Sequence, residues 1–214
     1  NGDFNCKVKK YDSKGTLVLE GEYLNSKLNG PGKEYYEGKL IFEGEYLYNY
    51  KLKGKEYIKG KLEFEGDYLF NNKWNGKGYD SNGNIIYILN NGSGKMREYD
   101  YFKRVLRYEG DYLNGKRHGK GKEYNTYRNI TIEAEYLNGE KNGKAKEYNW
   151  KGELMFEGEY KNDKRWNGKG QFGLGISKTF DGEIRDGHYW NGTTSGKDCV
   201  GRYHVTNYLN GKRV

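Results

Sequence analysis

The stretch YEGDYLNGKRHGKGKEY, residues 108–124, contains two runs of alternating residue types around an Asn-Gly pair. Alternation with period two places Tyr108 and Tyr112 on one face of a strand and the acidic residues between them on the other. Asn114 and Gly115 are a strong turn signal, because both central positions of a two-residue hairpin turn require positive φ. The residues that follow return as a second strand, so the stretch predicts a β-hairpin.

The pattern recurs along the chain, and the recurrence predicts the fold. Successive counterparts of one repeat position are separated by 23, 22, 19, 25, 24, 24, 24 and 24 residues. A fixed period of this size predicts an array in which each unit buries its face against its neighbours. The residues at this repeat position are Tyr23, Tyr46, Tyr68, Tyr87, Tyr112, Tyr136, Tyr160, Ile184 and Tyr208.

We therefore predict one all-β domain over residues 1–214, an elongated single-layer antiparallel ribbon of about nine stacked β-hairpins of about 24 residues each. Residues 79–107 and 171–207 depart from the repeat and are predicted to be degenerate units. The chain begins and ends within a unit, so we expect an excerpt of a longer array. Turns such as the one at residues 36–39 are expected to join one hairpin to the next.

Two further columns of the repeat support this fold. A small residue stands two places before each repeat tyrosine, and an apolar or aromatic residue stands four places before it, as Gly66 and Phe64 do for Tyr68. Glycine weakens a strand unless another group approaches closely. We therefore expect an aromatic ring from a neighbouring strand to lie over each small residue of this column.

The pattern of aromatic, Glu-Gly, acidic, Tyr, x, Asn-Gly-Lys, x, x, Gly-Lys-Gly resembles the MORN repeat, and GKLEFEGD at residues 60–67 resembles the bacterial variant of that family. The resemblance covers about seven of the nine units and implies an array fold. MORN proteins include scaffolds that link membranes to the cytoskeleton, and the repeat also accompanies lipid-kinase and methyltransferase domains. No such catalytic domain is present in these residues, so the resemblance implies no activity here.

The composition favours a thin sheet over a thick globular core. Hydrophobic residues make up 34% of the chain, below the usual value of about 45–50%, and 23 residues are tyrosines. No apolar run approaches the roughly 18 residues that a membrane-spanning helix needs. Cys6 and Cys199 lie at opposite ends of the array, too far apart for a disulfide, which favours a reducing compartment. Sequons at residues 91–93, 129–131 and 191–193 leave a secreted protein open.

The residues that suggest chemistry are explained by the repeat. Glu pairs such as Glu157 and Glu159 recur in nearly every unit, whereas a catalytic pair is needed once, so we predict structural salt bridges. The glycine-rich matches at residues 110–117 and 168–173 arise from the repeat itself. The three histidines are unclustered and no metal-ligand spacing is found. We predict no catalytic, cofactor or metal site, and a protein that is not an enzyme.

The net charge of +8, with lysines concentrated in the turns, has two interpretations. A basic edge could bind anionic lipid headgroups or acidic protein surfaces. Alternatively, the lysines provide solubility and protect sheet edges from aggregation. Nucleic-acid binding is disfavoured, because the acidic strand positions would repel a phosphate backbone.

Aromatic residues are the candidate partner contacts. The row of Tyr112, Tyr136 and Tyr160 and the turn residues Trp74 and Trp166 could form a groove for a peptide or helix. For most of the row, however, we favour the interpretation that these rings are the core. Contacts specific to a partner are expected where the repeat decays. The preferred patch there consists of His188, Tyr189, Trp190 and Arg202.

The sequence thus predicts a non-catalytic scaffold that binds a cytoskeletal or scaffold protein partner, with an anionic lipid surface as a further possible contact. The expected location is cytoplasmic, associated with cytoskeleton or membrane, and open ribbon ends allow a homodimer. The alternative is a secreted or surface adhesion module whose Tyr and Trp rows bind carbohydrate or choline-like ligands, because aromatic cages attract quaternary ammonium groups.

Overall fold

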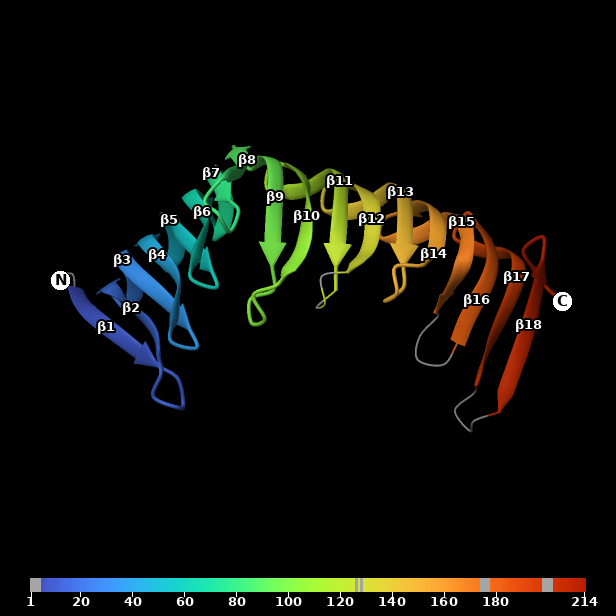
Figure 1. Ribbon diagram of the computed structural model, residues 1–214, viewed down its shortest axis with the longest axis horizontal. Helices are drawn as coiled ribbons and strands as arrows, with labels where there is room; N and C mark the ends of the chain where they lie inside the picture. The colour runs from blue at the N-terminus through green and yellow to red at the C-terminus, as the bar shows by residue number, and fades with distance from the viewer. Residues whose placement is uncertain (1–4, 126, 128, 174–177, 198–201) are drawn as a thin grey trace. The chain divides into compact units, whose positions relative to one another are not determined.

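The structure is a computed structural model that describes residues 5–125, 127, 129–173, 178–197 and 202–214. These residues form strands, turns and loops, and they include no helix that is long and apolar enough to cross a membrane (Figure 1). Nineteen strands in this part of the chain belong to one open antiparallel sheet. The predicted all-β fold, a single-layer antiparallel ribbon of stacked hairpins, is confirmed.

The strands are β1 (Asn5–Tyr11), β2 (Leu17–Leu24), β3 (Lys27–Tyr36), β4 (Lys39–Leu47), β5 (Tyr50–Ile58), β6 (Lys61–Leu69), β7 (Asn72–Tyr79), β8 (Ile85–Asn90), β9 (Ser93–Tyr99), β10 (Leu106–Leu113), β11 (Lys116–Tyr124), β12 (Ile130–Leu137), β13 (Glu140–Tyr148), β14 (Leu154–Lys161), β15 (Lys164–Gly173), β16 (Lys178–Arg185), β17 (His188–Lys197), β18 (Tyr203–Leu209) and β19 (Lys212–Arg213).

By their packing the residues divide into two compact units. The first unit comprises Asn1–Arg104 and Asp111–Lys116, and the second comprises Val105–Gly110 and Arg117–Val214. Within each unit, strands that are consecutive in the chain pair antiparallel, as β3 and β4 do. The degenerate stretches still form strands, namely β8 and β9 in one and β16 and β17 in the other. A single array over residues 1–214 stays a prediction.

The turns have the chemistry that the sequence predicts. Asn114 and Gly115, between β10 and β11, have φ values of 51° and 76°. Positive φ at both central positions matches the right-handed twist of the flanking strands, which is why Asn and Gly are favoured there. Glu37 and Gly38, between β3 and β4, repeat this geometry with φ values of 49° and 72°. Both predicted turns are therefore confirmed.

Several hairpin turns also bind the hairpin before them. The N–H of Gly187 donates to the carbonyl oxygen of Trp166 at 2.8 Å, and the indole of Trp166 lies against the same glycine. Beside it, the N–H of Asp186 donates to Oδ1 of Asn167 at 2.9 Å. The same arrangement joins Trp74 to Gly92 and Trp190 to Gly211. The motif Trp-Asn-Gly is thus a connector between consecutive hairpins.

A second connector replaces the first where the turn carries Asn or Asp in place of Gly. Oδ1 of Asn49 accepts the N–H of Leu28 at 2.8 Å, one hairpin earlier in the chain. Asn71 binds Lys51 in the same way, at 2.8 Å. Two chemically different turns therefore produce the same stacking of hairpins.

The core is a row of aromatic rings on one face of the sheet. The largest fully buried side chains are Phe42, Phe64, Tyr108, Phe156 and Phe180. Their rings cover glycines on the next strand, because the backbone can approach a ring closely only where no Cβ intervenes. A Cβ added to Gly76, for example, would lie 2.6 Å from Cζ of Phe64.

The small residues two places before each repeat tyrosine were predicted to lie beneath aromatic rings. Some of them are needed for a different reason. A Cβ on Gly44 or Gly66 would first meet the backbone of the next strand, not a ring. The rings instead lie over the glycines opposite this column, Gly54 and Gly76. The small residues are needed because two backbones approach closely, a requirement that alternation of residue types does not reveal.

Partly buried polar contacts accompany the rings. In the second unit, Nε and Nη2 of Arg165 donate to the carboxylate of Glu147 at 2.5 and 2.6 Å, and the Tyr160 hydroxyl donates to the same group at 2.6 Å. In the first unit, Tyr46 and Lys51 bind Glu34 at 2.8 and 3.0 Å. Such charge-assisted bonds satisfy polar groups that would otherwise be costly to bury.

The loop between β9 and β10 crosses back over the first unit. The rings of Tyr101 and Phe102 contact Tyr36 edge-on, each with its ring centroid 6.1 Å away. Nη2 of Arg104 donates to the carbonyl oxygen of Tyr57 at 2.7 Å, although 47 residues separate them in the chain. This loop joins the degenerate stretch to strands formed much earlier in the sequence.

Candidate interaction groove

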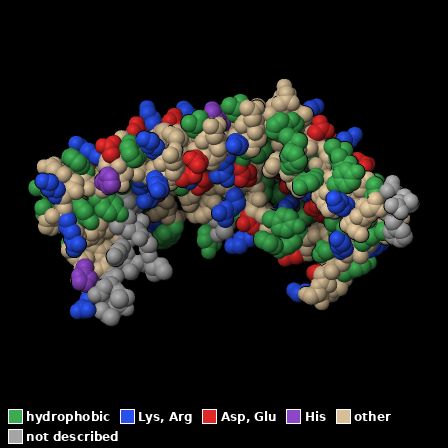
Figure 2. Space-filling model, turned by 180° about the vertical axis from the view of Figure 1, so that it is seen from behind, with side chains coloured by type: hydrophobic (Ala, Val, Ile, Leu, Met, Phe, Trp, Pro, Cys, Tyr) green, Lys and Arg blue, Asp and Glu red, His purple; other side chains and the backbone are tan. Residues whose placement is uncertain are grey.

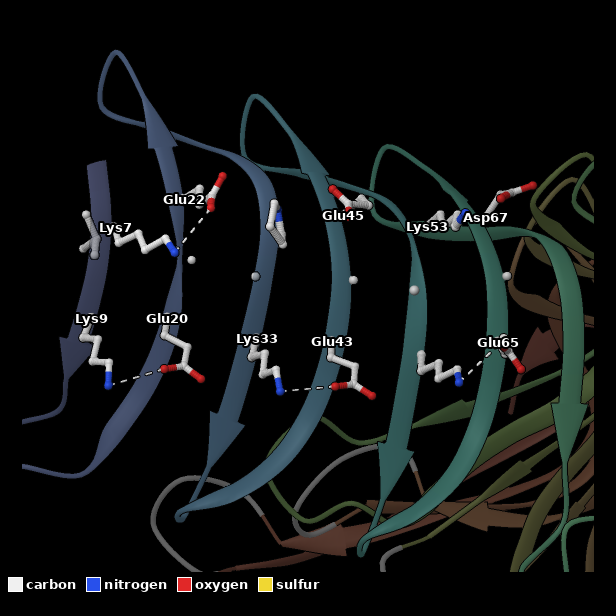
Figure 3. A pocket seen from close by; sticks show the side chains of 18 residues that line it. Lys7, Lys9, Glu20, Glu22, Lys33, Glu43, Glu45, Lys53, Glu65 and Asp67 are labelled. Atoms are coloured by element: carbon white, nitrogen blue, oxygen red, sulfur yellow. Dashed lines mark ion pairs between the residues drawn. The ribbon is translucent and has the colours of Figure 1, made fainter. Parts of the chain in front are cut away.

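The face of the first unit opposite the rings is hollowed into a groove of about 970 Å³ that crosses β1 to β6 (Figure 3). Its floor is backbone, because the floor residues direct their Cβ positions toward the ring face. These residues lie directly opposite one another on successive strands and are Val8, Gly21, Gly32, Gly44, Gly54 and Gly66.

One wall of the groove, the first charge row, alternates in sign from strand to strand. It consists of Lys9, Glu20, Lys33, Glu43, Lys55 and Glu65. Ion pairs join these residues two by two within hairpins, at 3.7 Å for Lys9 with Glu20, 3.5 Å for Lys33 with Glu43 and 3.5 Å for Lys55 with Glu65. The prediction that the repeated Glu residues form structural salt bridges is confirmed for this row.

Tyrosines fix two carboxylates of this row. The hydroxyls of Tyr35 and Tyr57 donate to Glu20 and Glu43, each at 2.7 Å. These hydrogen bonds are the main cause that lowers the pKa of both carboxyl groups. Desolvation, together with the same bonds, raises the pKa of Tyr35 and of Tyr57 to about 12. The Glu20 and Glu43 carboxylates are therefore held in place and stay charged at neutral pH.

In the opposite wall, the second charge row, fewer of the charged side chains form ion pairs with one another. It consists of Lys7, Glu22, Pro31, Glu45, Lys53 and Asp67. Lys7 and Glu22 form an ion pair at 3.9 Å. Lys53 lies opposite Glu45 on one side and Asp67 on the other, yet within the described part of the chain none of these three exposed side chains forms an ion pair. Three charges of alternating sign thus remain available.

The groove as a whole is close to neutral. Five lysines and six carboxylates line it, so the net charge of +8 does not arise here. Figure 2 likewise shows basic and acidic side chains interspersed on the face it presents. A surface of this kind complements a partner that carries both signs of charge better than it complements a polyanion.

The predicted tyrosine contacts lie in the core. Tyr112, Tyr136 and Tyr160 are 7%, 3% and 7% exposed, and their hydroxyls donate to Glu98, Glu123 and Glu147. The core interpretation, which the sequence favoured for most of this row, agrees with this burial. These three rings therefore do not line the groove and are not offered to a partner there.

The predicted tryptophans are half-buried connectors. Trp74 lies against Gly92 and Gly115, and Trp166 lies against Gly187. Nζ of Lys161 also lies 4.4 Å from the centroid of the Trp166 ring. These contacts within the chain account for Trp at these positions, so no contact with a partner protein is needed to explain it.

The preferred patch is not brought together. His188, Tyr189 and Trp190 begin β17, and Tyr189 stacks on Phe180 with ring centroids 4.5 Å apart. Arg202 is exposed and precedes Tyr203, which lies opposite Lys197 at the other end of β17. Arg202 is therefore about 20 Å or more from Trp190 along the strand. Cys199 lies outside the described residues, and Cys6 is free.

One buried charged group was not anticipated. Glu63 is 3% exposed, accepts the Tyr87 hydroxyl at 2.7 Å and contacts Nζ of Lys73, which also lies 3.6 Å from Glu56. Burial raises the pKa of Glu63 despite the lysine. The signal was present in the sequence, because Glu63 stands where the preceding hairpin has the buried Ile41.

Comparisons with known proteins do not assign the chain to a family. Among the described residues, no group of three or more acidic, His or Cys side chains could hold a metal ion. No protein-family model matches the sequence, and no curated protein matches it.

Proposed function

We propose that this chain is a non-catalytic scaffold that binds a protein partner along the groove of the first unit. The observation that carries the proposal is the pair of charge rows over a glycine floor, in which Glu45, Lys53 and Asp67 are left without ion pairs in the described structure. Complementary charge across an interface gives specificity and speeds association. A repeated surface of this kind suits a long partner.

The same geometry does not favour catalysis. The groove is an open channel on a single-layer sheet, and its first row is fixed in ion pairs and hydrogen bonds. Acid–base catalysis needs a group whose pKa lies near the working pH, whereas the pKa values of Glu20 and Glu43 are lowered. We therefore retain the proposal that the chain is not an enzyme and needs no cofactor.

The class of partner follows from the resemblance to MORN repeats. We propose a cytoplasmic cytoskeletal or scaffold protein, with the array located at the cytoskeleton or at a membrane-associated assembly. Contact with anionic lipid would use the lysine-bearing turn edges, because the groove has no net positive charge.

The adhesion alternative has less support. A choline-like ligand needs an open aromatic face. Several rings already have a cation of the chain over them, such as Lys51 at 4.1 Å from the centroid of Phe42 and Arg185 at 4.9 Å from that of Trp190. The faces of these rings are thus already occupied by cations of the chain itself and are not open to a choline-like ligand.

The test is co-purification from native cells with two matched variants. The groove-reversed variant carries Glu45→Arg, Lys53→Glu and Asp67→Arg. The edge-control variant carries Glu37→Arg, Lys59→Glu and Glu140→Arg, which make the same change in net charge at exposed positions outside the groove. We expect the groove-reversed variant to lose a protein that the wild type and the edge control retain. Equal recovery with all three proteins would refute the groove as the docking surface.

A further inference from the structure

We propose that the groove accepts an α-helix whose flank alternates in charge, and this inference rests on the proposed function. The helix would lie across the strands, with a basic, an acidic and a basic side chain on successive turns. These would face Glu45 on β4, Lys53 on β5 and Asp67 on β6 (Figure 3). The inference follows from spacing, from the availability of charge and from the shape of the floor.

The spacing favours a helix over an extended chain. Neighbouring strands lie about 4.8 Å apart, so the charges of Glu45, Lys53 and Asp67 alternate with about that step. A helix advances about 5.4 Å per turn, so residues at i, i+4 and i+7 follow the three charges closely. Same-face residues of an extended chain are about 6.6 Å apart and lose register by the third charge.

The second charge row is the wall whose charges are available to a partner. Each charge of the first row is already paired within its hairpin, and Glu20 and Glu43 are also bound by tyrosines. Exposed pairs of this kind contribute little stability, but they reduce what a partner gains at that wall. In the part of the chain that the structure describes, Glu45, Lys53 and Asp67 form no ion pair that a partner would have to replace. Because neighbouring charges in this row have opposite signs, a helix flank that carries one sign only would be repelled by part of the row.

The floor shapes the contact with the walls. Gly44, Gly54 and Gly66 lie in line and direct their Cβ positions toward the rings, so they present only backbone to the groove. The two walls stand on either side of this line with Cα atoms about 6.6 Å apart along each strand, which is narrower than a helix of about 10 Å diameter. The helix therefore rests on the walls, and the inferred partner segment carries small residues over the floor and alternating charges beside them.

The test uses synthetic helical peptides of about 20 residues, long enough to cross the groove. One carries Lys, Glu and Lys at i, i+4 and i+7 beside an alanine face. A second has the same composition in the order Lys, Lys, Glu, and a third carries Glu, Lys and Glu. Affinities are measured by titration calorimetry at low salt against the wild type, the groove-reversed variant and the edge-control variant, with anionic vesicles as an additional probe.

We expect the wild type to bind the Lys–Glu–Lys peptide at least about tenfold more tightly than either other peptide. The groove-reversed variant should prefer Glu–Lys–Glu, and the edge control should behave as the wild type. Equal affinities for all peptides, no binding, or binding to vesicles alone would overturn the inference. If such a result accompanied a partner lost only from the groove-reversed variant, the proposed function would stand and the helix would be excluded.

Discussion

The indole of Trp166 lies directly against Gly187, the second residue of the next hairpin turn. The carbonyl oxygen of Trp166 accepts the glycine N–H at 2.8 Å, and a Cβ added to Gly187 would lie 3.3 Å from Cε3 of the indole. A ring and a hydrogen bond from one residue thus hold the following hairpin. This relationship explains why Trp and Gly recur 21 residues apart in the second unit.

Gly187→Ala is expected to lower the free energy of unfolding by more than strain alone would. Gly187 has a φ of +78°, and alanine in this region costs about 1–2 kcal/mol. The contact with Trp166 adds about 1 kcal/mol, because the half-buried indole must shift by a few tenths of an ångström to admit the methyl group. Gly152→Ala is the matched control, because Gly152 has a φ of +83° but no atom within 4 Å of its added Cβ. Equal losses in urea denaturation would show that the indole contact contributes nothing.

Arg165→Met is expected to destabilise the second unit by about 2–3 kcal/mol, because it removes the cation from the Glu147 carboxylate, whose side chain is only 14% exposed. The control is Arg185→Met, which breaks the exposed pair with Glu183 at 3.0 Å and should cost less than about 1 kcal/mol. Thermal and chemical unfolding of both variants provide the comparison. A larger effect of the exposed pair would contradict the burial described here.

Stability should fall at alkaline pH, in part through Tyr35 and Tyr57, whose hydroxyls bind two carboxylates of the groove wall. In the folded protein the pKa values of Tyr35 and Tyr57 are raised to about 12, whereas an unfolded tyrosine titrates near about 10. Between these values the unfolded state binds fewer protons, so the free energy of unfolding decreases as pH rises. The double variant Tyr35→Phe/Tyr57→Phe should show a shallower decrease from pH 10 to 12. An unchanged slope would mean that these hydroxyls are not held in the fold.

Glu63→Gln should be tolerated far better than Lys73→Met. The raised pKa of Glu63 means that folding favours its protonated form, so its contribution to stability declines as pH rises above the ordinary carboxyl value. Glutamine keeps the shape and a hydrogen-bonding group for Tyr87. Lys73→Met removes the cation from both Glu56 and Glu63. Equal losses at pH 7 in chemical denaturation would contradict this assignment.

Much of the fold could be predicted from the repeat. The alternation around Tyr108 and Tyr112 gives the two faces, and the Asn114–Gly115 turn has the backbone geometry that only a few residue types favour. The reason for the small residues was only partly accessible. The rings of Phe42 and Phe64 cover the opposing glycines, a register relationship between strands that one strand's pattern does not contain.

The candidate site was harder to predict. The first charge row was correctly interpreted as paired, but the same interpretation is wrong for Glu45. The register places Lys53 opposite Glu45 and Asp67, yet no ion pair joins these side chains within the described residues. The tyrosine row was correctly favoured as core, whereas the role of the tryptophans as connectors between hairpins was not predicted. In a sheet one layer thick, exposed-looking rings such as Tyr136 and Trp166 are needed to bury neighbouring hairpins. Arg202 and Trp190 are close in sequence but are placed at opposite ends of β17.

The central claim is that the groove is the surface a partner covers, and lysine footprinting in native cell extract tests it directly. Acetylation of Lys33, Lys53 and Lys55, which line the groove, is compared with that of Lys39 and Lys59 at the turn edge, in extract and in the purified protein. The account predicts that the extract protects the three groove lysines and leaves the two edge lysines reactive. Protection of the edge lysines with a fully reactive groove would contradict it.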